Sequence, residues 1–176
     1  MIVVLMGVSG SGKTTIGTLL AERTGTIFAD ADDYHPASNK EKMRAGIALN
    51  DDDRQPWLEI LNGVLRSWYK SGEGGVLACS ALKEKYRQTL ANGMPANAIA
   101  FVWLDGDKKL LTERLALRHH EYMNPKLLDS QFATLEPPAD ALRVVNDRPP
   151  EQIVEEILQH VSMAASTPAQ QKQTKA

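Results

Sequence analysis

The sequence lacks most of the features that mark secreted, membrane-bound or nucleic-acid-binding proteins. A single cysteine, Cys79, excludes an internal disulfide and is typical of a protein in a reducing compartment. No apolar run approaches the ~20 residues that span a bilayer, and Met1 leads straight into a short apolar run rather than a signal peptide. The net charge of −2 provides no basic face for nucleic acid. We therefore expect a cytoplasmic protein without a nucleic-acid or membrane partner.

The chain has 176 residues, 43% hydrophobic and 24% charged, which fits a protein with one globular domain. Short apolar runs alternate with longer segments of helical periodicity, which is typical of a parallel sheet covered by helices. We expect the domain to span 1–165 and the polar segment 166–176 to be a disordered tail. The runs expected to form strands are 2–6, 26–30, 75–79, 99–105 and 142–146.

The stretch GVSGSGKT at 7–14 matches the phosphate-binding pattern G-x-x-x-x-G-K-[ST] at every fixed position. It lies between an apolar run and a segment of helical periodicity, where the pattern requires a strand and a helix. In such a loop, backbone N–H groups converge on phosphate at a helix N-terminus, the lysine contacts the β- and γ-phosphates, and the threonine hydroxyl can ligate Mg²⁺. The residues expected to bind a nucleoside triphosphate are Gly7, Val8, Ser9, Gly10, Ser11, Gly12, Lys13, Thr14 and Thr15.

Two carboxylates follow the second expected strand. Asp30 and Asp32 are two positions apart, so on an extended chain both point to the same side, at the edge where α/β proteins bind ligands. We expect Asp30 to hold Mg²⁺ together with Thr14, and Asp32 to accept a proton or hydrogen bond from the hydroxyl that attacks the γ-phosphate. The alternative for each carboxylate is a cap on the following turn. The pair favours a small kinase acting on a metabolite hydroxyl.

Five further motifs are narrower than the phosphate loop. They are D-x-D-x-x-H-P-x-x-N-x-x-K-M at 30–43, LNDDDRQPWL at 49–58, CSALKEKYR at 79–87, WLDGD at 103–107 and LLDSQFATLE at 127–136. With these motifs the chain resembles the small P-loop gluconate kinases, relatives of shikimate and adenylate kinases. The resemblance implies a three-layer α/β/α fold with a five-stranded parallel sheet, a lid at about 118–126, and a homodimer. It also implies that ATP phosphorylates D-gluconate to 6-phospho-D-gluconate.

A gluconate site should combine cations for the carboxylate with partners for the hydroxyls. Arg54 and Arg87 can bind a carboxylate through two parallel hydrogen bonds, and Lys83 lies one helical turn before Arg87. The alternative for each cation is a surface ion pair. The remaining expected substrate ligands, which would approach hydroxyl or phosphate groups, are Asp32, His35 and Ser80.

Two arginines precede or begin the expected lid. Arg114 and Arg118 are one helical turn apart, and the resemblance implies that Arg114 lies near the adenine while Arg118 reaches the transferring phosphoryl group. The alternative is a solvated helix end. The expected catalytic residues are therefore Lys13, Asp32 and Arg118.

Two other functions stay open at this point. One is a P-loop kinase acting on another small hydroxy acid, such as shikimate. The other is a nucleotide-binding regulatory protein with little turnover. The chain also departs from the family pattern at Ala31, where glycine is usual, and a methyl group there can crowd a close backbone approach.

Overall fold

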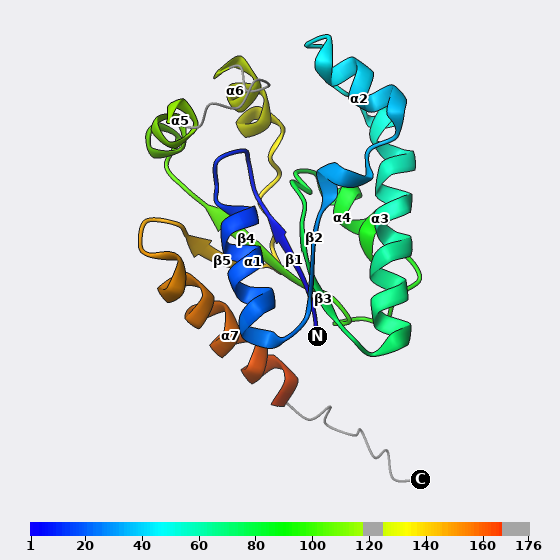
Figure 1. Ribbon diagram of the computed structural model, residues 1–176, viewed down its shortest axis with the longest axis vertical. Helices are drawn as coiled ribbons and strands as arrows, with labels where there is room; N and C mark the ends of the chain where they lie inside the picture. Colours follow the sequence, from blue (N-terminus) through cyan, green and yellow to red (C-terminus); the bar gives the residue numbers. More distant parts are fainter. Residues whose placement is uncertain (118–124, 167–176) are drawn as a thin grey trace, which may run out of the picture.

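A five-stranded parallel sheet forms the centre of the computed structural model, which describes residues 1–117 and 125–166 (Figure 1). The strand order is β2-β3-β1-β4-β5, and every neighbouring pair is parallel. The five strands predicted from the sequence are confirmed, with ends that differ by one residue at most. The strands are β1 (Ile2–Met6), β2 (Ile27–Asp30), β3 (Gly75–Ala78), β4 (Ala100–Asp105) and β5 (Leu142–Val145).

Alternate residues of β1 supply two separate cores, one on each face of the sheet. Val3 and Leu5 pack with α1 (Lys13–Thr24) and α7 (Pro150–Ser166). Val4 and Met6 pack with α3 (Asp51–Ser71) and α4 (Glu84–Ala91) on the other face. The continuous apolar run at the start of the chain is therefore a central strand buried on both sides, and the three-layer α/β/α arrangement is confirmed.

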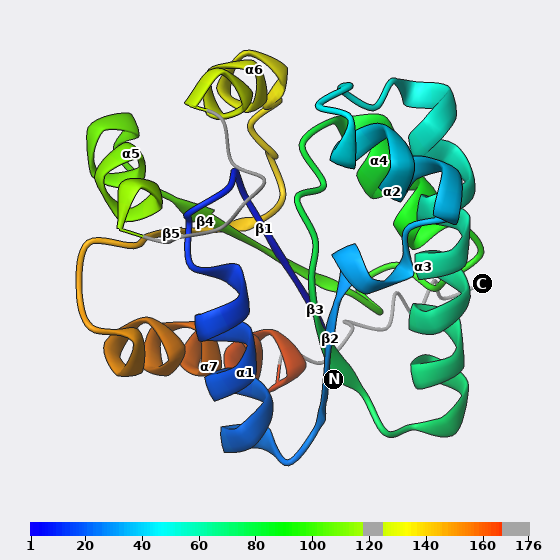
Figure 2. The ribbon, with the colours of Figure 1, turned by 45° about the horizontal axis from the view of Figure 1, so that its top comes forward.

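The remaining helices gather at the carboxyl end of the strands. Figures 1 and 2 show α5 (Lys108–Ala116) and α6 (Pro125–Thr134) on one side of this end and α2 (Ala37–Arg44) on the other. A 3₁₀ helix, η1 (Ala31–Tyr34), connects β2 to α2. In α/β proteins of this kind, ligands bind at the carboxyl edge of the sheet, so these elements border the expected site.

Parts of the predicted lid and tail lie outside the described residues. Positions 118–124 of the lid and 167–176 of the tail are among them, while 125–126 already belong to α6 and Ser166 ends α7. Within 1–117 and 125–166, no helix combines the length and the apolar character needed to cross a membrane.

Candidate active site

The loop between β1 and α1 has the backbone of a phosphate-binding loop. Gly7 and Gly12 adopt φ of 143° and 89°, a region that favours glycine. A Cβ at Gly12 would also lie 2.4 Å from Asn146 Nδ2, so the packing allows no side chain there. Because α1 begins at Lys13, directly after this turn, the N–H groups of its first turn border the loop and are available to an anion.

The loop lysine lies against the loop itself. Lys13 Nζ donates hydrogen bonds to the carbonyl oxygens of Gly7 and Val8, both at 3.0 Å. The Gly7 N–H in turn donates to the Ser80 carbonyl oxygen at 3.2 Å, which ties the loop to the segment that follows β3. The ammonium group therefore lies against the carbonyl groups of the loop, and Ser80 contacts the loop through its backbone.

Two side chains to which the sequence analysis gave no role also hold the loop. The Ser9 N–H donates to Gln131 Oε1 of α6 at 2.7 Å. Asn146, which follows β5 and is 5% exposed, donates from Nδ2 to the Ser11 carbonyl oxygen at 2.6 Å. Gln131 falls within the LLDSQFATLE motif, which could have pointed to a role for this residue. Asn146 belongs to none of the motifs, and no local pattern connects it with the phosphate loop.

Asp30 serves as both a neighbour of the loop threonine and a helix cap. Its Oδ2 accepts a hydrogen bond from Thr14 Oγ1 at 3.0 Å, and its Oδ1 accepts one from the Asp32 N–H at 3.1 Å. The cap considered for Asp30 is therefore present, and its role as an Mg²⁺ ligand stays a prediction. A hydroxyl and a carboxylate side by side form an oxygen donor set of the kind that Mg²⁺ prefers.

The prediction that Asp30 and Asp32 share one face of a strand was wrong. β2 ends at Asp30, and the chain turns at once into η1, because the Asp30 carboxylate caps this helix by accepting from the Asp32 N–H. Ala31 is 1% exposed, and its carbonyl oxygen accepts the Trp57 indole N–H at 2.7 Å, so its methyl group fits the core. Asp32 is consequently presented from a helical turn.

The Asp32 carboxylate is open to a substrate and close to the loop lysine. Its side chain is 87% exposed. Reduced hydration from the surrounding protein raises its pKa, and the negative charge of Asp30 raises it further, while the Lys13 ammonium acts in the opposite direction. The Lys13 ammonium thus favours the charged form of this carboxylate, which is the form that accepts a hydrogen bond.

His35 is a buried neutral imidazole next to Asp32. Its ring stacks on Trp57, with centroids 4.2 Å apart and an interplanar angle of 14°. Burial, and then the positive charges of Arg54 and Lys40, lower the pKa of His35 to about 4. The distance from His35 Nε2 to Asp32 Oδ1 is 3.8 Å.

Acidification is expected to destabilise the protein through His35 between pH 6.5 and about 4. In this range the unfolded chain binds a proton that the folded protein does not, because the folded-state pKa is lowered from 6.5 to about 4. The contribution of neutral His35 to the free energy of unfolding is complete above pH 6.5, falls with the pH and levels off below about pH 4. Its size is on the order of 3 kcal/mol.

Urea unfolding of the protein and of a His35→Gln variant across this pH range measures the effect. The variant should show the shallower loss of stability. Asp51 and Asp53 have a lowered pKa, so their own contributions are lost only below pH 3.8 and do not overlap with this range. Equal pH dependence in the two proteins would contradict a neutral, buried His35.

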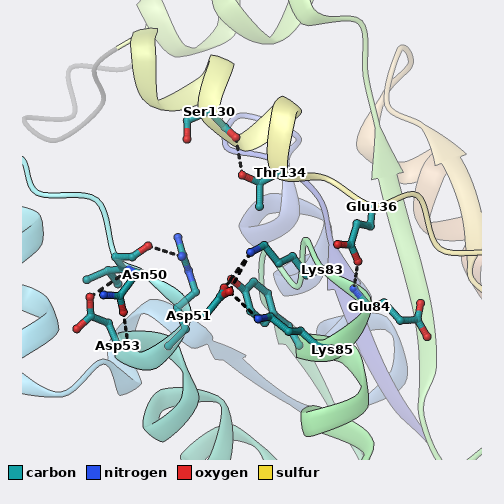
Figure 3. A network of polar contacts seen from close by, with 12 residues as sticks. Asn50, Asp51, Asp53, Lys83, Glu84, Lys85, Ser130, Thr134 and Glu136 are labelled. Carbon is teal, nitrogen blue, oxygen red and sulfur yellow. Dashed lines mark hydrogen bonds and ion pairs between the residues drawn. The ribbon is translucent and has the colours of Figure 1, made fainter.

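The expected cations of the substrate site lie at the start of α3 and α4, and Figure 3 shows one of them, Lys83, beside Asp51. Lys83 Nζ donates to Asp51 Oδ1 at 2.9 Å, and the same carboxylate also accepts Lys85 Nζ and the Tyr86 hydroxyl. These donors lower the pKa of Asp51, with Lys85 contributing most. The ion pair considered for Lys83 is therefore present, on a side chain that is 26% exposed.

Arg54 and Arg87 differ sharply in their surroundings. The Arg54 guanidinium contacts the Leu49 carbonyl oxygen and lies 5.8 Å above the centre of the Tyr86 ring. Arg87 is 6% exposed; it donates to the carbonyl oxygens of Ala81 and Leu82 at 3.0 and 3.3 Å, and to Glu84 at 3.1 Å.

The two arginines of the lid region are only partly described. Arg114 is half-buried on α5, and this helix packs against the phosphate loop: a Cβ at Gly10 would lie 3.0 Å from Leu115 Cγ. Arg118 lies outside the described residues, so its catalytic role stays a prediction.

A Gln131→Leu variant should loosen the phosphate loop. The substitution removes the acceptor of the Ser9 N–H, and a lost hydrogen bond of this kind lowers the free energy of unfolding by about 1 kcal/mol. We expect the KM for ATP to rise roughly threefold or more for the same reason. Urea unfolding and steady-state kinetics measure both effects.

The matched control for Gln131 is Gln159→Leu. Gln159 is exposed on α7, and its amide donates only a long 3.4 Å hydrogen bond to Glu155. This variant should leave the KM for ATP unchanged. Equal KM values in all three proteins would contradict a role of Gln131 in shaping the loop.

The chain is similar to known proteins over most of its length, both in sequence and in structure. The thermosensitive gluconokinase of Escherichia coli (strain K12) is 48% identical over 143 residues, 81% of this chain and 75% of the relative. The gluconokinase of Gluconobacter oxydans (strain 621H) is 45% identical over 161 residues, 89% of each chain. The crystal structure of a gluconokinase from Sinorhizobium meliloti 1021 is 40% identical, covers 93% of each chain and superimposes with a TM-score of 0.81.

A phosphate loop alone serves many nucleotide-binding proteins, but here an exposed carboxylate, Asp32, is joined to the loop threonine through Asp30, at the edge of the sheet where a hydroxyl acceptor would bind. The fold and this site define a P-loop kinase that uses ATP, and residues 9–162 match the family model described as Shikimate kinase. Within that class, the identity to its relatives shows that the chain belongs to the gluconokinase family.

Proposed function

We propose that this protein phosphorylates D-gluconate with ATP, giving ADP and 6-phospho-D-gluconate. The observation that carries the proposal is the 45–48% identity to gluconokinases over most of each chain. The geometry supplies what the reaction needs, namely a phosphate loop with its lysine and an exposed carboxylate beside it. A shikimate-specific kinase has no comparable support, because the relatives at 45–48% identity are gluconokinases.

The residues of the proposed site have two tasks: some bind the phosphates of ATP, and Asp32 orients the attacking hydroxyl. The loop N–H groups and Lys13 hold the β- and γ-phosphates of ATP. Thr14 and Asp30 form the oxygen pair that would hold Mg²⁺, which when bound supplies positive charge to the phosphate oxygens. Asp32 accepts a hydrogen bond from the attacking hydroxyl and fixes its direction toward the γ-phosphate. Since the transition state is loose, this positioning contributes more than strong basicity.

The gluconate carboxylate is assigned to Arg54 and Lys83. Both lie where α3 and α4 begin, and Lys83 keeps 26% of its side chain exposed beside Asp51. Arg87 is assigned a structural role instead of carboxylate binding, because its guanidinium is buried and donates to two backbone carbonyls and Glu84. It would hold the segment that follows β3, whose Ser80 carbonyl contacts the phosphate loop.

Release of ADP with a panel of acceptors tests the proposed function. Gluconate should give the highest kcat/KM, and glucose, which lacks the carboxylate, and shikimate should be poor acceptors. Phosphorus NMR of the product should show phosphate on the terminal hydroxyl. If gluconate is no better than shikimate, the assigned substrate is wrong although the kinase class stands. If no acceptor stimulates ADP release, the regulatory alternative is correct.

A further inference from the structure

Asn39 on α2 is a buried polar side chain whose orientation is fixed by a backbone group. It is 2% exposed, and its Nδ2 donates to the Asp53 carbonyl oxygen at 2.8 Å. A carbonyl oxygen can only accept, so the nitrogen side of the amide must face it. The first turn of α3 is itself rigid, because Asn50 and Asp53 form a capping box there. The amide of Asn39 therefore cannot be turned around without losing this bond.

The other hydrogen of the same amide nitrogen faces His35. The distance from Asn39 Nδ2 to His35 Nδ1 is 3.3 Å. A donor at this position requires Nδ1 to be an acceptor, so the single proton of the neutral imidazole belongs on Nε2. The stacking on Trp57, whose own N–H is held by the Ala31 carbonyl, keeps the ring in this orientation.

The protonated Nε2 lies on the Asp32 side of the ring. Its distance of 3.8 Å from Asp32 Oδ1 is too long for a direct hydrogen bond. Two atoms at this separation can both lie within hydrogen-bonding distance of a single oxygen atom. One substrate hydroxyl could thus accept from His35 and donate to Asp32, which is the complementary pair that a hydroxyl needs.

We propose that Asn39 is a positioning residue that fixes His35 as the Nε2–H tautomer, so that His35 and Asp32 together present one donor and one acceptor to a substrate hydroxyl. The part concerning the hydroxyl rests on the proposed function, whereas the tautomer is a property of the free protein. A donor and an acceptor in fixed positions would select a hydroxyl over a group that can only accept or only donate.

The matched pair of variants is Asn39→Asp and Asn62→Asp. Asn62 on α3 is buried as well, with 9% of its surface exposed. Its Nδ2 donates to two backbone carbonyl oxygens, those of Leu90 and Asn92, at 2.8 and 2.9 Å, and not to a histidine. Both substitutions replace a buried donor with a carboxylate and should lower stability. Only Asn39→Asp places an acceptor opposite His35 Nδ1, which would draw the proton to that nitrogen.

Nitrogen NMR of the imidazole side chains, with His35 identified by its loss in His35→Gln, reads the tautomer directly. We expect Nε2–H in the unmodified protein and in Asn62→Asp, and a protonated Nδ1 in Asn39→Asp. With gluconate, kcat should fall at least about tenfold in Asn39→Asp, while the KM for ATP stays within about twofold. If Asn39→Asp does not fold, Asn39→Leu, which removes the donor without adding charge, should show mixed tautomers and the same selective loss of kcat.

A proton on Nδ1 in the unmodified protein would overturn the proposal, as would an equal loss of kcat in Asn62→Asp. A failure of the proposed function looks different. In that case the unmodified protein still shows Nε2–H but gluconate elicits no ADP, and the hydroxyl contact is rejected while the tautomer stands.

Discussion

An Asp32→Asn variant is expected to lose almost all phosphoryl transfer to gluconate while it still binds ATP. The carboxylate is exposed, and Asp30 joins it to Thr14 of the phosphate loop, so its loss removes the acceptor that directs the hydroxyl toward the γ-phosphate. We expect kcat to fall by about 10²–10⁴, the usual contribution of a positioned acid–base group. The KM for ATP should stay within about twofold, because the loop and the Thr14–Asp30 pair are untouched.

The control for this variant is Asp33→Asn. Asp33 lies next to Asp32 in η1 and is also exposed, so the variant makes the same change of charge one residue away. It should retain kcat within a few fold. Loss of ATP binding in Asp32→Asn would assign Asp32 to holding the nucleotide, and near-normal turnover would remove it from the reaction.

A Lys13→Ala variant is expected to lose at least about 10³ in kcat/KM. The ammonium is the positive charge placed against the loop, and electrostatic groups of this kind contribute most when charge develops on the phosphate oxygens. The KM for ATP should rise as well, because the same group contacts phosphate before transfer. Steady-state kinetics and calorimetric titration with ATP separate the two effects.

The fold should survive the loss of Lys13, because Asn146 and Gln131 continue to hold the loop from β5 and α6. Urea unfolding should therefore give nearly the same stability for the variant and the unmodified protein. Lys70→Ala, at an exposed position near the end of α3, is the control for removing a lysine. Activity in Lys13→Ala close to that of Lys70→Ala would contradict the phosphate contact.

The sequence predicted the features that depend on local patterns. β1 could be recognised because all of its residues are apolar, and a strand buried on both faces requires this. The phosphate loop could be recognised because its glycines are fixed by backbone conformation and packing, as at Gly12. Neither inference needed a partner from elsewhere in the chain.

The predictions that were wrong or left alternatives open concern residues that are far apart in the sequence or depend on a side-chain contact. The chain turns after Asp30 because the Asp30 side chain caps η1. The alternation of residues along a strand does not indicate where such a cap ends the strand. The contacts from Gln131 to Ser9 and from Asn146 to Ser11 join residues 122 and 135 positions apart. No local pattern specifies such pairs.

The cations of the substrate site show the same limit. An ion pair and a ligand contact were both open for Lys83, and only the packing of α3 against α4 brings Asp51 to it. The Arg87 side chain can be buried because backbone carbonyl groups accept its hydrogen bonds. The pattern of charges in the sequence does not indicate that these carbonyl groups face it.

A crystal structure with gluconate and a non-hydrolysable ATP analogue tests the central claim most directly. The account predicts the γ-phosphate against Lys13 and one gluconate hydroxyl about 3 Å from both the Asp32 carboxylate and His35 Nε2, facing that phosphate. Gluconate bound with its hydroxyls on the far side of Asp32, or Asp32 turned away from the γ-phosphate, would contradict it.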